Sequence, residues 1–400
     1  MSSASQRAGG NSPAGLPPAQ RFGLPDFPWD TLAPAKQRAS AHPDGIVDLS
    51  MGAPVDPTPE VIRRALAEAA DAHGYPQTHG TPALRAAVVE WFERRRGVAG
   101  LDPAGVLPTI GSKEMVAWLP MLLGLGPGDA VAFPSVAYPT YDVGARLAGA
   151  RPLPFDKVAE LGPAESADAP ALVWVNSPGN PTGKVLDVGE LAEIVAWARR
   201  RGAVVVGDEC YAELDWREDV PDAVSGVRGS VPSLLDPRVC GGDHTGLLVC
   251  YSLSKQSNLG GYRAAFVAGD PALVARLLEV RRHAGMMMPS PVQEAMRVAL
   301  AEDGHVAEQR ERYARRRAVL LPALLGAGFK VEESQAGLYL WSTRDEDCWE
   351  TVDFLAGLGI LAAPGSFYGV AASRHVRIAL TATDERIAAA AARLVGSVRS

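Results

Sequence analysis

The chain has 400 residues, of which 47% are hydrophobic and 21% charged, and its formal net charge is −7 at pH 7. This composition is typical of a globular protein with enough residues for two domains and a large core. The acidic balance and the lack of a long basic run argue against a nucleic-acid-binding surface. No apolar segment reaches the roughly 18–20 residues that a membrane span needs.

The N-terminal residues 1–22 are rich in Ser, Gly, Pro and Ala, with neither the basic start nor the apolar run of a signal peptide. We therefore expect a disordered tail there, in a cytoplasmic protein. The four cysteines form no C-x-x-C pair and show no zinc spacing, which is typical of reduced thiols. The scattered histidines lack metal-ligand spacing, so no metal is predicted.

From residue 58 to about 270, helical patterns alternate with apolar, strand-like runs. Helices are predicted over 57–74 and 81–97, each with a Thr near its start and a Gly at its end. Further helices are predicted at 112–125, 141–149 and 188–202, and strands at 106–110, 130–134, 171–176, 203–209, 246–254 and 263–269. Strands this apolar, separated by helices, indicate an α/β fold whose mainly parallel sheet is covered on both faces.

After about residue 290 the pattern changes to that of a smaller α+β domain. It predicts helices at 291–301, 304–327 and 349–357, extended segments at 329–334, 337–343, 359–365 and 375–380, and a closing helix from Asp384. We expect a large domain over 49–290 and a small C-terminal domain over 291–400. The proline-rich segment 23–48 is expected to pack on the small domain or on a partner.

The string "NSPGNPTGK", residues 176–184, directly follows a buried predicted strand. It therefore lies at the carboxyl edge of the sheet, where open α/β folds bind ligands. Two prolines stiffen the loop and two glycines allow tight geometry, so that Asn176 and Asn180 are held rigidly. An ordinary strand-to-helix turn is the alternative, and the length of the string favours a site.

A second strand end carries Asp208 and, three residues later, Tyr211, in "VVVGDECY". A carboxylate at this position is either buried and paired or faces a ligand. A ligand with a basic ring nitrogen is a suitable partner, because the carboxylate then keeps that nitrogen protonated. A helix N-cap role for Asp208 remains the alternative.

The string "YSLSKQSNLGGYR", residues 251–263, places Lys255 between two serines in a chain that prefers arginine. Arginine cannot replace a lysine that must lose its proton. Hydroxyls, two glycines and Arg263 at the end of a strand suit a phosphate monoester. "GSKEM", residues 111–115, opens a predicted helix and offers backbone N–H groups and the Ser112 hydroxyl to the same anion.

These groups together describe a site for pyridoxal 5′-phosphate (PLP): a lysine, a carboxylate for a ring nitrogen, an Asn/Tyr pair for a phenolate oxygen and a phosphate cup. With these motifs in order from Gly52 to Arg377, the chain resembles the fold-type I PLP enzymes, specifically the class I and II aminotransferases. The resemblance implies a mainly parallel seven-stranded sheet with helices on both faces, PLP as cofactor and amino-acid and keto-acid substrates. It also implies a homodimer with shared active sites.

The resemblance assigns three catalytic positions. Lys255 matches the lysine that binds the cofactor covalently, Asp208 matches the partner of the pyridine nitrogen, and Tyr211 matches a residue that bonds the phenolic oxygen O3′. Asn180 matches the second residue at O3′ and also lies among the substrate-binding positions.

Other positions match cofactor- and substrate-binding residues. The phosphate cup corresponds to Ser112, Lys113, Ser252 and Arg263. Tyr138 matches the ring that stacks on the cofactor, and Tyr75 matches a tyrosine that reaches the phosphate of the neighbouring subunit. Arg377 matches the arginine that grips the substrate α-carboxylate, and Gly52 lies where the backbone approaches that carboxylate.

Strings outside the generic site, such as "FPWDTLAPAK", "AYPTYDVGARLAG" and "HVRIALTATDER", are similar to the N-succinyldiaminopimelate aminotransferases. This implies transfer between glutamate and N-succinyl-2-amino-6-ketopimelate in lysine and diaminopimelate biosynthesis. An aspartate- or alanine-type aminotransferase and a PLP β C–S lyase are the alternatives. The effector domain of a transcription regulator would need a DNA-binding module that 22 residues cannot supply. Met286–Met288 either line the site or fill the core.

Overall fold

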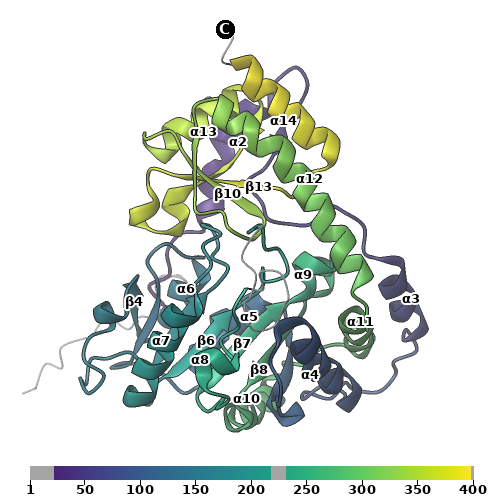
Figure 1. The fold of residues 1–400 in the computed structure, drawn as a ribbon, viewed down its shortest axis with the longest axis vertical. Coiled ribbons are helices and arrows are strands. Elements are labelled where there is room, and N and C mark those ends of the chain that lie inside the picture. The colour runs from purple at the N-terminus through teal and green to yellow at the C-terminus, as the bar shows by residue number, and fades with distance from the viewer. Residues whose placement is uncertain (1–21, 218–230, 398–400) are drawn as a thin grey trace, which may run out of the picture.

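The computed structural model describes residues 22–217 and 231–397 (Figure 1). Residues 1–21, most of the expected disordered tail, lie outside the described residues. No helix in the described ranges is both long and apolar enough to cross a membrane.

The large sheet has seven strands in the order β2-β8-β7-β6-β5-β3-β4. β3 to β7 run parallel, whereas β8 is antiparallel to both of its neighbours. The strands are β2 (Val106–Ile110), β3 (Ala130–Pro134), β4 (Arg151–Phe155), β5 (Leu172–Asn176), β6 (Val204–Asp208), β7 (Leu247–Ser252) and β8 (Ala264–Gly269). The prediction of a mainly parallel seven-stranded sheet is confirmed.

Both faces of this sheet are buried, as the apolar strands predicted. Along β5, Val173 and Val175 enter the hydrophobic cluster on one face, and Leu172 and Trp174 enter the cluster on the other. Successive side chains of a strand point to opposite faces, so a strand that is apolar at every position needs cover on both sides. Helices before, between and after the strands supply this cover, namely α4 (Pro82–Arg96), α5 (Ser112–Leu122), α6 (Thr140–Leu147), α7 (Val188–Arg201), α8 (Pro237–Cys240) and α10 (Pro271–Ala284).

The predicted elements differ from the structure at several places. β4 and α10 are absent from the prediction; β4 reads "RPLPF", and its prolines are tolerated because it is an edge strand that pairs only with β3. The helix predicted over 57–74 spans only Glu60–Glu68 (α3). The strand predicted to reach residue 254 ends at Ser252, because the Ser252 hydroxyl accepts from the Ser254 N–H and caps the short helix α9 (Leu253–Gln256).

A second, four-stranded antiparallel sheet has the order β12-β13-β10-β9 and lies above the large sheet in Figure 1. Its strands are β9 (Lys330–Glu332), β10 (Tyr339–Thr343), β12 (Ala363–Pro364) and β13 (Val376–Ala379); α12 (Gly304–Gly326), α13 (Cys348–Gly357) and α14 (Asp384–Ser397) pack with it. The N-terminal segment joins this unit: α2 (Ala33–Ser40) packs against α13, and β1 (Val47–Asp48) pairs with β11 (Ile360–Leu361).

Helix α11 (Ser290–Ala301) packs against α3 and α4, and its apolar residues Val292, Met296 and Leu300 belong to the hydrophobic cluster of the large sheet. We therefore propose that the large domain continues through α11, beyond the boundary at residue 290 expected from the sequence. The long helix α12 then leads to the second sheet.

Candidate active site

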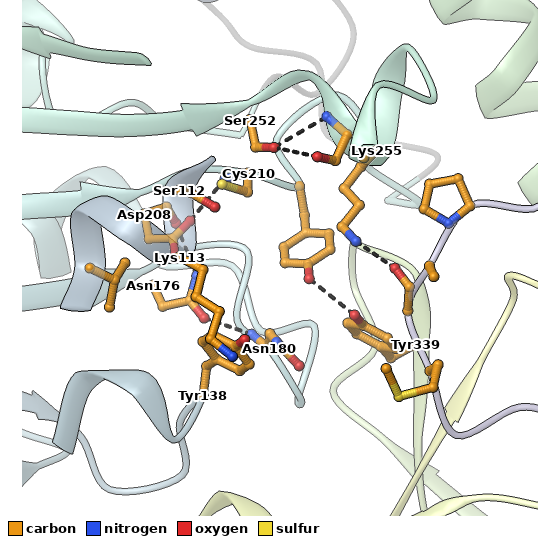
Figure 2. A pocket seen from close by; sticks show the side chains of 18 of the residues that line it. Ser112, Lys113, Tyr138, Asn176, Asn180, Asp208, Cys210, Ser252, Lys255 and Tyr339 are labelled. Carbon is orange, nitrogen blue, oxygen red and sulfur yellow. Dashed lines mark hydrogen bonds between the residues drawn. The ribbon is translucent and has the colours of Figure 1, made fainter. Parts of the chain in front are cut away.

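A cavity of about 390 Å³ lies where strands β5, β6 and β7 end, between the large sheet and residues of the second sheet (Figure 2). It brings together segments that are far apart in the sequence. The predicted site residues that line it are Gly52, Ser112, Lys113, Tyr138, Asn180, Asp208, Tyr211, Ser252, Lys255, Arg263 and Arg377. Tyr75, the remaining predicted residue, lies elsewhere and is 96% exposed. Met286–Met288 do not line the cavity, and Met288 is buried in the core.

Asn176 connects the predicted loop to the neighbouring strand. It pairs with Asp208 in the register of β5 and β6, and its Nδ2 donates to the Asp208 carbonyl at 3.0 Å. Its Oδ1 accepts from the backbone N–H of Asn180 at 2.8 Å. These two bonds fix the loop that carries the Asn180 side chain, so that Asn180 is held at the cavity wall.

The Asp208 carboxylate is buried at the end of β6 and faces the cavity (Figure 2). It accepts from the Tyr141 hydroxyl at 2.8 Å and from the Cys210 N–H at 3.3 Å, and no described cationic side chain forms an ion pair with it. Burial raises the pKa of Asp208, and the hydrogen bonds from Cys210 and Tyr141 oppose that rise. A buried carboxylate whose hydrogen-bond donors are neutral, and which forms no ion pair among the described residues, has capacity left for a cationic N–H.

Tyr141 was not among the predicted site residues. It lies in the first turn of α6, three positions after Tyr138, which precedes that helix. Burial, the nearby charge of Asp208 and the hydrogen bond to it raise the pKa of Tyr141 well above its ordinary value, so it acts as a donor to Asp208. Its local pattern is that of a core residue, because its ring packs in the hydrophobic cluster on one face of the large sheet.

Lys255 projects from α9 into the cavity, where its Nζ donates to the carbonyl oxygen of Gly52 (Figure 2). Ser252 caps this helix, and its hydroxyl donates to the Ser254 hydroxyl at 2.9 Å. Lys255 has no carboxylate partner among the described residues, so its amine is available to a ligand.

An anion-binding cup forms where α5 begins. Ser112 is the first residue of that helix, and Gly111 precedes it with a φ of +81°. A Cβ atom on Gly111 would lie 2.2 Å from Nη2 of Arg263, so only glycine lets this guanidinium lie against the helix start. Free backbone N–H groups, two serine hydroxyls and a guanidinium thus meet at one end of the cavity, an arrangement that suits a phosphate.

Aromatic rings form another wall of the cavity. The Lys113 Nζ lies 5.9 Å from the centre of the Phe27 ring and 5.8 Å from that of Tyr138. Phe27 and Trp29, from the N-terminal segment, also line the cavity. Neither residue was predicted to lie in the site, because nothing in "FPWDTL" shows which part of the fold that segment reaches.

Arg377 is 3% exposed and has no carboxylate partner in the described ranges. Its Nη1 donates to Asn180 Oδ1 at 2.9 Å and its Nη2 to the Ser50 carbonyl at 2.6 Å, while its Nε has no partner. The guanidinium lies over the Tyr339 ring, with 4.1 Å to the ring centre. A buried cation without a counter-ion is costly, so this arrangement predicts an anionic ligand.

Tyr211 and Tyr339 form a pair of phenols at the cavity. Their hydroxyl oxygens are 3.0 Å apart, and both side chains are buried. Burial and the adjacent Tyr339 phenol raise the pKa of Tyr211 well above its ordinary value. Burial also acts to raise the pKa of Tyr339, but the charges of Arg377 and Lys255 and the hydrogen bond with Tyr211 outweigh it and lower that pKa. Tyr339 is a second site residue that the sequence analysis missed.

The cavity is cationic in a chain of net charge −7. Four cations line it without an ion-pair partner in the described ranges, namely Lys113, Lys255, Arg263 and Arg377, and Asp208 is the one acidic residue among the lining residues. The donors fit PLP, which needs an amine for its aldehyde, a carboxylate for its ring nitrogen and N–H or O–H donors for its phosphate. No cluster of His, Cys, Asp or Glu that could hold a metal occurs in the part of the chain that the structure describes.

Comparisons with known proteins agree with this chemistry. Residues 44–394 match the family described as aminotransferase class I and II. The 4-dedimethylamino-4-oxo-anhydrotetracycline transaminase OxyQ of Streptomyces rimosus is 61% identical over 93% of this chain and 99% of that protein. The probable aminotransferase Rv1178 of Mycobacterium tuberculosis is 58% identical over 93% and 85%. The structure of a probable N-succinyldiaminopimelate aminotransferase from Thermus thermophilus is 30% identical over 92% and 99%, with a TM-score of 0.80.

Proposed function

The chain belongs to the class I and II aminotransferases and is a transaminase, and from that premise we propose that it binds PLP through Lys255 and acts on acidic amino acids. The observation that carries the proposal is the set of four cations lining one cavity without carboxylate partners among the described residues. A phosphate and one or more substrate carboxylates would supply the missing negative charge.

PLP, when bound, supplies an aldehyde for the amino group and a ring that withdraws electrons from the substrate's α-carbon. We assign Lys255 to the aldehyde, Asp208 to the ring nitrogen, and Asn180 and Tyr211 to O3′. Tyr138 would stack on the ring. The phosphate would be held by Ser112, Lys113, Ser252 and Arg263, with Tyr75 contributed by a second subunit.

Three side chains then divide the work of the reaction. The Arg377 guanidinium binds the α-carboxylate through two N–H groups and so orients the α C–H bond. The Lys255 amine lines the same cavity as Arg377, and it removes the α-proton. The Asp208 carboxylate holds a proton on the ring nitrogen, and the hydrogen bond from Tyr141 fixes its position.

For the substrates we propose glutamate as amino donor and N-succinyl-2-amino-6-ketopimelate as acceptor, in diaminopimelate and lysine biosynthesis. The sequence strings similar to this enzyme group and the likeness to the Thermus thermophilus structure support the proposal. The acceptor carries carboxylates beyond the one that Arg377 would bind. Lys113 would serve the phosphate through its backbone N–H at the start of α5, which leaves its ammonium, without an acidic partner in the described ranges, to add positive charge for these carboxylates.

A second candidate acceptor is a polycyclic ketone of the anhydrotetracycline type. The higher identity to the Streptomyces rimosus transaminase, 61% against 30%, favours this candidate. The aromatic wall formed by Phe27, Trp29 and Tyr138 would suit a planar ligand.

The test combines one variant with a substrate panel. Lys255→Ala should abolish turnover and the borohydride-reducible cofactor absorption, and a variant that keeps turnover would contradict the assignment. For the wild-type enzyme, the cofactor spectrum is followed while glutamate, N-succinyldiaminopimelate, aspartate and alanine are offered separately.

Conversion of the cofactor to its amino form by glutamate and by N-succinyldiaminopimelate is the expected result. The enzyme charged with glutamate is then offered 4-dedimethylamino-4-oxo-anhydrotetracycline. If the enzyme reacts with this ketone but not with N-succinyldiaminopimelate, the ketone is the acceptor and the proposal of N-succinyl-2-amino-6-ketopimelate is wrong. Release of pyruvate and ammonia from a cysteine conjugate would instead indicate a lyase.

A further inference from the structure

Tyr339 lies at the first position of β10, in the second sheet, and its side chain reaches the cavity below (Figure 2). It is opposite Ala379 of β13, so Arg377 is its diagonal neighbour on the same strand pair. The Tyr339 ring is 3% exposed and carries the Arg377 guanidinium on its face. Packing therefore fixes where its hydroxyl points.

That hydroxyl lies among the groups to which the proposed function assigns the chemistry. It is 3.0 Å from the Tyr211 hydroxyl. A Cβ atom on Gly52 would lie 2.0 Å from it, so the hydroxyl packs directly against the Gly52 backbone, whose carbonyl accepts from Lys255. Lys255 and Arg377 both act on Tyr339 through their positive charge.

Two phenols that share one hydrogen bond must divide the roles of donor and acceptor. If Tyr211 is to donate to the phenolic oxygen of a bound cofactor, its own proton is used there, and its oxygen is left to accept. The proton of the bond between the two phenols must then come from Tyr339, whose hydroxyl oxygen is 3.0 Å from that of Tyr211.

We propose, resting on the proposed function, that Tyr339 is a further positioning residue: its hydroxyl donates to the Tyr211 hydroxyl and thereby fixes Tyr211 as the donor to the phenolic oxygen of PLP. Tyr339 touches neither the reacting carbon nor the cofactor in this role. It acts through Tyr211, and a chain of two hydrogen bonds makes Tyr211 a better donor than it would be alone.

The experiment measures the pH at which the absorption band of the bound cofactor changes in substrate-free enzyme. A hydrogen bond to the ionised phenolic oxygen favours the ionised form and lowers this midpoint. Tyr339→Phe keeps the ring beneath Arg377 but removes the hydroxyl, so the midpoint should rise by about half a unit to one unit, the size of one hydrogen bond. Tyr211→Phe should raise it at least as far.

The double variant tests whether Tyr339 acts through Tyr211. Tyr211→Phe combined with Tyr339→Phe should shift the midpoint no further than Tyr211→Phe alone, whereas additive shifts would overturn the proposal. Replacing Tyr339 with 4-aminophenylalanine keeps the ring and a neutral N–H donor that is weaker than the phenol, and should raise the midpoint. This second replacement decides the matter if Tyr339→Phe is poorly folded, and an unchanged midpoint would overturn the proposal.

Tyr313→Phe is the matched control. Tyr313 is also a buried phenol with a guanidinium, that of Arg316, over its ring, but its hydroxyl has no hydrogen-bond partner in the described ranges and it does not line the cavity. The pH midpoint of the cofactor absorption change in the Tyr313→Phe variant should equal that of the wild type. If Tyr211→Phe shifts the midpoint and Tyr339→Phe does not, the inference fails and the proposed function stands. If the wild-type protein binds no PLP at all, both fail.

Discussion

At the scale of single residues, the site consists of charges that the protein itself leaves unmatched. Arg377 is buried without a carboxylate, and Asp208 is buried without an ion-pair partner among the described residues. Burying each charge costs desolvation free energy, and the binding of a ligand of opposite charge offsets that cost. We therefore propose that the cavity selects ligands that carry both a cationic ring nitrogen and anionic groups.

The geometry of Arg377 leads to a prediction about substrate affinity. Arg377→Lys keeps the positive charge but loses the planar fork, and it leaves Asn180 and the Ser50 carbonyl with one fewer donor. The dissociation constant for glutamate should rise about 10- to 100-fold, the range expected for one charge-assisted hydrogen bond or two. Spectral titration of the cofactor measures it.

The affinity for PLP should change little in the same variant, because Arg377 contacts none of the groups assigned to the phosphate. Equilibrium dialysis of PLP against the Arg377→Lys protein provides this comparison. Equal losses of glutamate and PLP affinity would show that Arg377 supports the whole cavity instead of gripping the substrate carboxylate.

At the scale of the elements, the segment that carries Gly52 is attached to the second unit by a buried ion pair. Arg316, in α12, donates to both oxygens of Asp56, at 2.6 and 2.8 Å, and to Asp384 at the start of α14. Arg316 is 4% exposed at its side chain. This network connects α12, α14 and the chain around residue 56, and so positions the cavity wall at Gly52.

Removing the cation should destabilise the protein. Arg316→Met leaves the Asp56 carboxylate buried and unpaired, which should lower the free energy of unfolding by about 3 kcal/mol. Chemical denaturation measures the loss. Arg315→Met in the same helix is the control, because Arg315 is 55% exposed and its pair with Glu311 is a surface pair, so that variant should lose less than about 0.5 kcal/mol.

The same pair predicts a dependence on pH. Burial acts to raise the pKa of Asp56, but the hydrogen bonds from Arg316 and Gln309 outweigh it and lower the pKa below the ordinary 3.8. An acid with a lowered native pKa contributes stability above its unfolded pKa and loses it as the pH falls through the native value. The deficit of Arg316→Met should therefore be full at neutral pH and shrink below about pH 4, where the unpaired carboxylate takes up a proton. A deficit that is constant from pH 7 to pH 3 would contradict this account.

At the scale of the whole molecule, one predicted site residue has no role within a single chain. Tyr75 is 96% exposed and does not line the cavity. An exposed tyrosine expected to bind phosphate has a function only if it enters the cavity of another subunit. We therefore propose a homodimer in which each active site is completed by Tyr75 of the partner.

Mixing two inactive variants tests the shared site. Lys255→Ala lacks the reactive amine of its own site, and Tyr75→Ala lacks the tyrosine that would enter the active site of the partner subunit. Refolded together in equal amounts, they should recover about a quarter of the wild-type activity, because half of the dimers are mixed and each has one intact site. Sedimentation measures the assembly. No recovery from mixed dimers would show that Tyr75 does not complete the site of the partner subunit, and a fully active monomer would overturn the dimer itself.

The sequence alone determined the residues that lie in contiguous strings at strand ends. Lys255, Asp208, Asn180 and Ser112 each follow or precede an apolar run, and the carboxyl ends of parallel strands meet at one edge of a sheet. Local chain direction therefore predicts that these side chains converge. The mainly parallel sheet followed from the same apolar runs.

Only the tertiary structure decided which aromatic residues belong to the site. Tyr141, Tyr339, Phe27 and Trp29 look like core residues in their local patterns, and three of them come from elements that the fold brings to the cavity from outside the large sheet. Tyr339 reaches Tyr211 only because the second sheet lies over the end of β6. Sequence spacing contains no record of that contact, because it is made between residues 128 positions apart.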